Sequence, residues 1–160
     1  MATRNGLNSQ TAKFFKALME LRSGSAPEEL ETFCTFFYDD AVANPISMRE
    51  HKDAAKGREA IREAYKTLIG QQFIEERQVL SQTIDPDQKL VCCETRNRLN
   101  VAGKILDPFY ETIVLRFNDD LQVTRLNVYS CRSPIVAILQ VQSGKGPYAN
   151  VSSSTKKLRE

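Results

Sequence analysis

The stretch "ETRNRLNVAGKILDPFYETI", residues 94–113, decides how the fold of this chain is interpreted. Two segments rich in strand formers flank a short turn that contains glycine, and this pattern predicts an antiparallel hairpin. A turn centred on residues 102–103 places Glu94 directly opposite Glu111. Because side chains two residues apart share a face, one face of the predicted hairpin is apolar at one end and charged at the other.

A face of this kind is typical of a pocket with an apolar floor and a polar mouth. Burial raises the pKa of a carboxyl group and prepares it for general acid or base catalysis. The same register places Arg96 opposite Phe109, close to the two carboxylates. We therefore predict Glu111 as the catalytic base or acid, Glu94 as its partner, and Arg96 as the group that stabilises an oxyanion or enolate.

A different register gives a different interpretation of the same charges. A shift of one residue moves Glu94 and Arg96 to the other face, where they form cross-strand ion pairs in solvent or in a dimer interface. For Glu111 the sequence favours the pocket, because the residues that share its face are more apolar than the residues between them. The first set is Phe109, Ile113, Leu115 and Phe117, and the second is Tyr110, Thr112, Val114 and Arg116.

The hairpin belongs to a meander of four predicted strands, at residues 73–84, 89–101, 107–117 and 121–131. Apolar residues at helical spacing predict three helices ahead of this meander, at residues 10–24, 26–40 and 57–70. The second of these is expected to end near Asp39 and Asp40. Helices followed by a strand meander indicate an α+β fold, with the helices covering one face of a curved sheet.

Length and composition exclude several classes of function. A chain of 160 residues predicts one domain, residues 1–142, followed by a disordered tail at 143–160 that is poor in apolar residues. A net charge of +2 gives no electrostatic grip on nucleic acid, and no apolar run approaches the roughly 20 residues that span a membrane, so we expect a soluble, cytoplasmic protein. One histidine and no C-x-x-C spacing argue against a metal site, and we expect no cofactor.

Three segments carry a resemblance to a known family. They are "FFYDDAVANP" at 36–45, "GREAIREAY" at 57–65 and "VTRLNVY" at 123–129. Over roughly residues 9–132 the chain resembles the SnoaL-like proteins of the nuclear-transport-factor-two-like superfamily. The resemblance implies a cone, in which three N-terminal helices pack on a curved antiparallel sheet around an internal pocket. It also implies a homodimer through the convex sheet face. Members include a ketosteroid isomerase, an epoxide hydrolase, dehydratases, polyketide cyclases and proteins without catalytic activity.

The catalytic residues of these members do not carry over intact. Ketosteroid isomerases have an aspartate base at the position that resembles Asn44. Limonene-type epoxide hydrolases have a carboxylate on the last strand, where this chain has Asn127. Scytalone-type dehydratases need two histidines, and this chain has only His51. The fold therefore does not decide the activity.

We expect a cofactor-independent enzyme of secondary metabolism that isomerises, cyclises or dehydrates a mostly apolar, polyketide- or terpenoid-like small molecule by proton transfer. The residues predicted to bind this substrate are Asn44, His51, Tyr65, Phe109, Ile113, Leu126 and Tyr129. The alternative is a non-catalytic ligand-binding or dimerisation module of the same fold, in which the charges of the hairpin form surface salt bridges.

Overall fold

The computed structural model describes residues 1–46, 53–147 and 149. Within these residues the chain forms helices α1 (Arg4–Glu20), α2 (Pro27–Cys34), α3 (Gly57–Gln71) and α4 (Ser133–Ser143). The strands are β1 (Phe37–Asn44), β2 (Ala55–Lys56), β3 (Gln72–Asp85), β4 (Leu90–Val101), β5 (Lys104–Phe117) and β6 (Val123–Tyr129).

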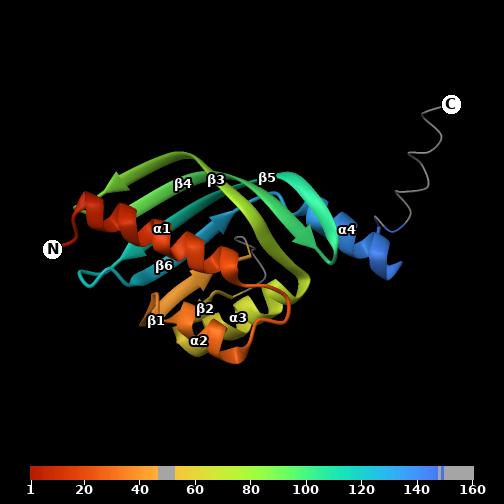
Figure 1. Cartoon of the computed structure of the whole chain (residues 1–160), viewed down its shortest axis with the longest axis horizontal. Coiled ribbons are helices and arrows are strands. Elements are labelled where there is room, and N and C mark those ends of the chain that lie inside the picture. The colour runs from red at the N-terminus through yellow and green to blue at the C-terminus, as the bar shows by residue number, and fades with distance from the viewer. Residues whose placement is uncertain (47–52, 148, 150–160) are drawn as a thin grey trace.

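The six strands form one curved sheet in the order β2-β1-β6-β5-β4-β3. Strands β1 and β6 are parallel, and the other neighbouring pairs are antiparallel. Figure 1 shows α1 lying across the sheet, α2 and α3 beside it, and α4 at the far end of the molecule. The face toward α1–α3 is called the inner face below, and the opposite one the outer face. The predicted α+β fold, with three N-terminal helices on a curved sheet, is confirmed.

An aromatic cluster joins the helices to the sheet. Phe14 of α1, Phe33 of α2, Phe37 of β1 and Tyr65 of α3 are all buried. The rings of Phe33 and Tyr65 meet edge to face, with centroids 4.8 Å apart. Edge-to-face ring pairs add to the stabilisation that burial provides, so this cluster fixes α3 against the base of the cone.

The prediction for the second helix is wrong at its C-terminal end. Helix α2 ends at Cys34, and the segment expected to complete it forms β1. In β1, Phe37, Ala41 and Ala43 are buried, whereas Asp39 is exposed and forms an ion pair with Arg58. Pairing with β6 supplies the backbone partners of this segment, so tertiary context overrides its helical periodicity.

Helix α4 was not predicted. It ends at Ser143 and is capped by Gly144, whose φ of 66° lies in the left-handed region that glycine adopts readily. Its Ile135 is fully buried and packs in a small cluster with Leu99, Val101 and Phe109 of the hairpin. No helix among the described residues is long and apolar enough to cross a membrane. Residues 150–160 of the predicted tail lie outside the described residues, and the domain boundary at 142 stays a prediction.

A bulge in β5 changes the register of the hairpin. Close to the turn Leu99 faces Leu106, as a symmetrical hairpin requires, but further along Asn97 faces Phe109. Strand β5 therefore contains one extra residue between these pairs, at the position of Pro108. Proline has no backbone N–H to donate to the sheet and is typical of bulges.

A second bulge, in β3, decides the direction of Arg77. The register against β4 shifts between Ile74 and Glu76. In a regular strand, residues an odd number of positions apart lie on opposite faces. The shift instead brings Ile74 and Arg77 onto the inner face, where both contribute to the same cavity.

Candidate functional site

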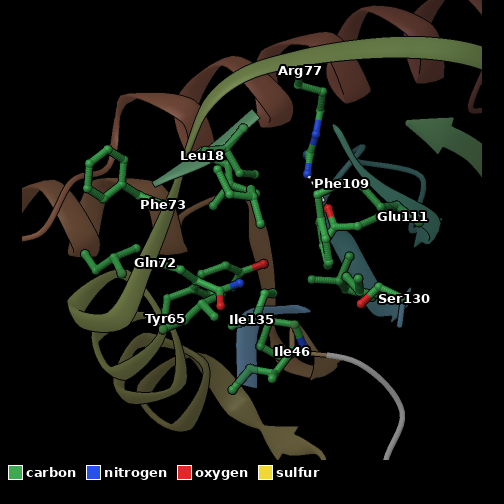
Figure 2. A pocket seen from close by; sticks show the side chains of 18 of the residues that line it. Leu18, Ile46, Tyr65, Gln72, Phe73, Arg77, Phe109, Glu111, Ser130 and Ile135 are labelled. Atoms are coloured by element: carbon green, nitrogen blue, oxygen red, sulfur yellow. Dashed lines mark hydrogen bonds and ion pairs between the residues drawn. The ribbon is translucent and has the colours of Figure 1, made fainter. Parts of the chain in front are cut away.

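The inner face encloses a cavity between the sheet, α1 and α3, with Ile135 of α4 in its wall. Its volume is about 40 Å³. The wall is mostly apolar, and its polar side chains include Tyr65, Gln72, Arg77 and Glu111. Figure 2 shows Arg77 and Glu111 on one side of this space and Tyr65 and Gln72 on the other.

Glu111 is the carboxylate of the cavity wall. Its Oε2 accepts a hydrogen bond from Arg77 Nη2 at 2.9 Å and another from Asn97 Nδ2 at 2.8 Å. Both donors reach the same oxygen, and among the described residues none donates to Oε1. Burial raises the pKa of Glu111, although Arg77 and Asn97 act in the opposite direction. The site thus contains a carboxyl group that takes up a proton more readily than it would in water.

Arg77 holds this carboxylate and is itself buried, with 3 % of its side chain exposed. Its Nε donates to Asn97 Oδ1 at 2.9 Å, and its guanidinium lies over the ring of Phe15, 4.7 Å from the centroid. Burial lowers its pKa, and the charge of Glu111 opposes that effect. Its Nη1 is buried without a hydrogen-bond partner in the described part of the chain.

Asn97 fixes the geometry of the pair. It is fully buried, accepts from Arg77, and donates to both Glu111 and Thr95 Oγ1. Thr95 Oγ1 in turn donates to the backbone oxygen of Glu111 at 3.2 Å. Because an arginine only donates, the amide oxygen of Asn97 must face Arg77 and its nitrogen is left for the carboxylate. This closed network holds Glu111 in one orientation.

The opposite side of the cavity carries Tyr65 and Gln72. Burial raises the pKa of Tyr65, so its phenol stays protonated and can donate a hydrogen bond. Gln72 is the first residue of β3, and 9 % of it is exposed. Its Oε1 has no hydrogen-bond partner in the described part of the chain.

The predicted pairing of Glu94 with Glu111 is wrong. Because of the bulge in β5, Thr95 lies opposite Glu111, and Glu94 lies opposite Thr112 on the outer face. There Glu94 accepts from Ser81 Oγ at 3.2 Å. Neither Glu94 nor Arg96 can therefore act beside Glu111.

Arg96 follows the alternative interpretation of the hairpin. It lies on the outer face and forms an ion pair with Asp107, Nη2 to Oδ1, at 2.8 Å. Its neighbour Arg98 pairs with Glu75, Nε to Oε2, at 3.1 Å. These are the cross-strand ion pairs that the shifted register predicts.

The structure brings together most of the predicted substrate-binding residues. Those that line the cavity are Tyr65, Phe109, Ile113 and Leu126. Tyr129 lies opposite Thr112 on the outer face and is 45 % exposed, so its prediction is wrong. Asn44 does not line this cavity; its Nδ2 donates to Asn127 Oδ1 at 3.0 Å, and it lies in the wall of a second hollow of about 320 Å³, so its role stays a prediction. His51 lies outside the described residues.

Sequence reasoning missed Gln72, Arg77 and Asn97. Arg77 and Asn97 are polar residues inside predicted strands, and Gln72 directly precedes the first of those strands. Their inward direction depends on the two bulges or on the end of α3. For Asn97 a signal was present, because Pro108 interrupts the ladder of β5 and so indicates a bulge in that strand. For Arg77 we find no comparable signal in the sequence.

The cavity is small for a ligand site. Pockets that hold drug-sized ligands measure about 300–1,000 Å³, and this one measures about 40 Å³. Ile46 at the end of the first described segment and Ile135 of α4 both form part of its wall. A ligand of several rings therefore needs one of these walls to move.

Comparison with solved structures supports this architecture, whereas the sequence comparisons found no match. No protein-family model matches the sequence, and no curated protein matches it at a significant level. Among solved structures, the chain is similar in fold to SalBIII, described as an epoxide hydrolase/cyclase-like enzyme with a role in pyran ring formation in the polyether salinomycin. The TM-score is 0.61, the identity is 17 %, and the match covers 82 % of this chain and 95 % of that one. The chain therefore has the SnoaL-like α+β fold.

Proposed function

We propose that the protein is a cofactor-independent enzyme of secondary metabolism that moves a proton on a mostly apolar, carbonyl-containing small molecule. The observation that carries this proposal is the buried Glu111, whose pKa is raised by burial while two donors hold one of its oxygens. A general acid or base works best when its pKa lies near the working pH, and burial moves a carboxyl group in that direction.

The geometry supports a different role for each of Glu111, Arg77 and Asn97. Glu111 Oε1 takes a proton from the carbon next to the carbonyl, and the electrons of that C–H bond form the double bond of an enolate. The carbonyl oxygen then carries the negative charge and accepts a hydrogen bond from Arg77 Nη1, which has no other partner among the described residues. Return of the proton from Glu111 to a different carbon completes an isomerisation. Asn97 positions both groups.

The similarity to SalBIII adds support of a different kind. That protein is described as a cyclase-like enzyme of polyether formation, and the inner cavity of this chain is mostly apolar. An apolar wall with a few convergent polar groups is the usual character of a small-molecule site. We therefore extend the proposal to cyclisation and dehydration, which need the same acid and base.

Proton exchange tests this proposal without knowledge of the natural substrate. In D₂O, the protein should speed the loss of the NMR signal of the CH₂ group next to the carbonyl of α-tetralone, a rigid apolar ketone. Glu111→Gln should lower the protein-dependent rate by about 10²- to 10⁴-fold. Glu75→Gln, which removes a carboxylate held by Arg98 and Asn100 on the outer face, should leave it unchanged. Equal rates for wild type and Glu111→Gln would rule out Glu111 as the base.

One observation favours the second candidate, a non-catalytic ligand-binding or dimerisation module. The cavity of about 40 Å³ does not admit a ring system without movement of its wall. Under this candidate the Arg77–Glu111 pair only stabilises the fold. Absence of any exchange by the wild-type protein, together with saturable binding of α-tetralone, is the result that supports it.

A further inference from the structure

Two residues of the cavity wall each have a buried polar atom without a hydrogen-bond partner in the described part of the chain, namely Gln72 Oε1 and Arg77 Nη1. Gln72 is 9 % exposed, and the side chain of Arg77 is 3 % exposed. Buried polar groups without a partner are rare in folded proteins, because each costs free energy that a hydrogen bond would offset. Two of them in the wall of one cavity indicate a ligand that supplies the missing partners.

The two groups lie at different ends of the cavity. Gln72 begins β3, and the bulge of that strand turns Arg77, five residues later, onto the same inner face. Figure 2 shows Gln72 on the side of Tyr65, and Arg77 on the side of Glu111. Apart from the phenol of Tyr65, the wall residues close to Gln72 in the chain are apolar, among them Leu68, Ile69 and Ile74.

We propose that Gln72 binds a hydroxyl group of the substrate, so that the substrate class is a hydroxylated apolar ketone. Its carbonyl faces Arg77 and Glu111, and its hydroxyl faces Gln72. This inference rests on the proposed function, because it takes the Arg77 end as the reacting end. It adds a specificity-determining residue and a second polar group on the substrate.

The chemistry of an amide selects the hydroxyl. A hydroxyl group both donates and accepts, so it can pair with the oxygen of the Gln72 amide and also with its nitrogen. A purely apolar group would leave the amide unpaired at this end. A carboxylate or ammonium group would be buried among apolar residues without an opposite charge, which is far more costly.

Matched probes test the inference by binding alone. The first probe is α-tetralone, the second carries an added hydroxyl on the ring carbon farthest from the carbonyl, and the third is tetralin, which has neither polar group. We expect the hydroxylated ketone to bind about tenfold more tightly than α-tetralone, since one net hydrogen bond is worth about that factor. Dissociation constants follow from NMR titration of the wild-type protein.

Two variants test whether the amide of Gln72 causes the preference for the hydroxylated ketone. Gln72→Met keeps the length of the side chain and removes its polar atoms, so the hydroxylated ketone and α-tetralone should bind with equal affinity. Because the change also removes an unpartnered buried oxygen, the thermal midpoint should stay the same or rise. Gln71→Met, the same substitution at the exposed preceding residue, should keep the tenfold preference.

Three outcomes overturn the inference. Equal binding of the two ketones by the wild-type protein would show that a water molecule, for which the cavity has room, satisfies Gln72. A preference that survives in Gln72→Met would place the hydroxyl elsewhere. Lack of binding by all three probes would exclude this substrate class. The proposed function fails separately, since it requires proton exchange on α-tetralone, whereas the hydroxyl preference is measured without turnover.

Discussion

Glu111→Gln separates the energetic effects that act on the buried pair. At 2.9 Å and an effective dielectric constant of about 20, the attraction between Arg77 and Glu111 amounts to about 6 kcal/mol, while removing each ion from water costs several kcal/mol. Because the pKa of Glu111 is raised despite Arg77, desolvation exceeds the attraction. The amide still accepts from both donors. We therefore expect the free energy of unfolding to change by less than about 1 kcal/mol, a shift of less than about 4 °C in the thermal midpoint.

Glu111→Leu should behave differently. It removes the acceptor of Arg77 Nη2 and Asn97 Nδ2, which leaves a buried charge without a partner. Breaking a buried ion pair in this way costs about 3–5 kcal/mol, which corresponds to a fall of about 6–20 °C in a domain of this size. Differential scanning calorimetry of both variants at pH 7 measures the two effects.

The pH dependence of stability shows whether folding raises or lowers the pKa of Glu111. The folded-state pKa of Glu111 is raised above the unfolded value of about 4.3, so its contribution to stability is complete below that value and is lost as pH rises through the folded-state pKa. Relative to wild type, Glu111→Gln should therefore gain stability as the pH rises from about 4.3 through the folded-state pKa of Glu111. In Glu75→Gln the trend should reverse, because hydrogen bonds from Asn100 and Arg98 lower the pKa of Glu75.

One pH dependence of stability would contradict a raised pKa of Glu111. If Glu111→Gln loses stability relative to wild type as pH rises, as the Glu75 variant should, the attraction of Arg77 outweighs desolvation. Glu111 would then be ionised throughout the physiological range, and the pair would be an ordinary buried salt bridge.

Three further predictions concern the rest of the molecule. Ile135→Ala should cost about 2–5 kcal/mol and raise the association rate of α-tetralone in stopped-flow titration, because Ile135 closes the cavity, whereas Val141→Ala on the exposed face of the same helix should change neither. Removal of all residues after Ser143 should leave the thermal midpoint within about 2 °C, since no helix or strand is described beyond it. The outer face carries the exposed rings of Tyr110 and Tyr129, and sedimentation should reveal a homodimer that Tyr110→Glu with Tyr129→Glu dissociates; a monomeric wild type would contradict this.

The sequence was sufficient for the parts of the fold that depend on local periodicity. The helix at 57–70 and the four strands of the meander lie where their apolar patterns predict them. Strand β1 was missed because its helical spacing of aromatic residues continues from α2, and only pairing with β6 distinguishes the two structures. Helix α4 was missed because its sequence does not alternate between apolar and polar residues at helical spacing. Its one fully buried residue, Ile135, belongs to a cluster formed by tertiary contacts.

For the site, the sequence identified the face of Glu111 and failed on its partners. The apolar neighbours of Glu111 indicate burial whatever strand lies beside it, so this prediction needs no register. The partners on β4 depend on the register. Because of the one extra residue at Pro108, Thr95 and Asn97 lie on the inner face with Glu111, and Glu94 and Arg96 lie on the outer face. A residue-by-residue pattern cannot count bulges, although proline within a strand is a reason to expect one.

A cluster of one glutamate, one arginine and one asparagine lies on each face of the sheet, built from β3, β4 and β5 inside and from β3 and β4 outside. Inside, Glu111 is held by Arg77 and Asn97; outside, Glu75 is held by Arg98 and Asn100.

The residue types are the same in the two clusters, and in each an arginine and an asparagine donate to the carboxylate, to one oxygen inside and to both oxygens outside. The carboxylate side chains are 12 % exposed inside and 30 % exposed outside. The pKa of the inner carboxyl is raised by burial, and that of the outer one is lowered by its hydrogen bonds. Because the same side chains give opposite shifts, the chemistry of the candidate site follows from the face it occupies. In such a sheet the strand register, which sets the face of each side chain, therefore decides which carboxylate can act as an acid or a base.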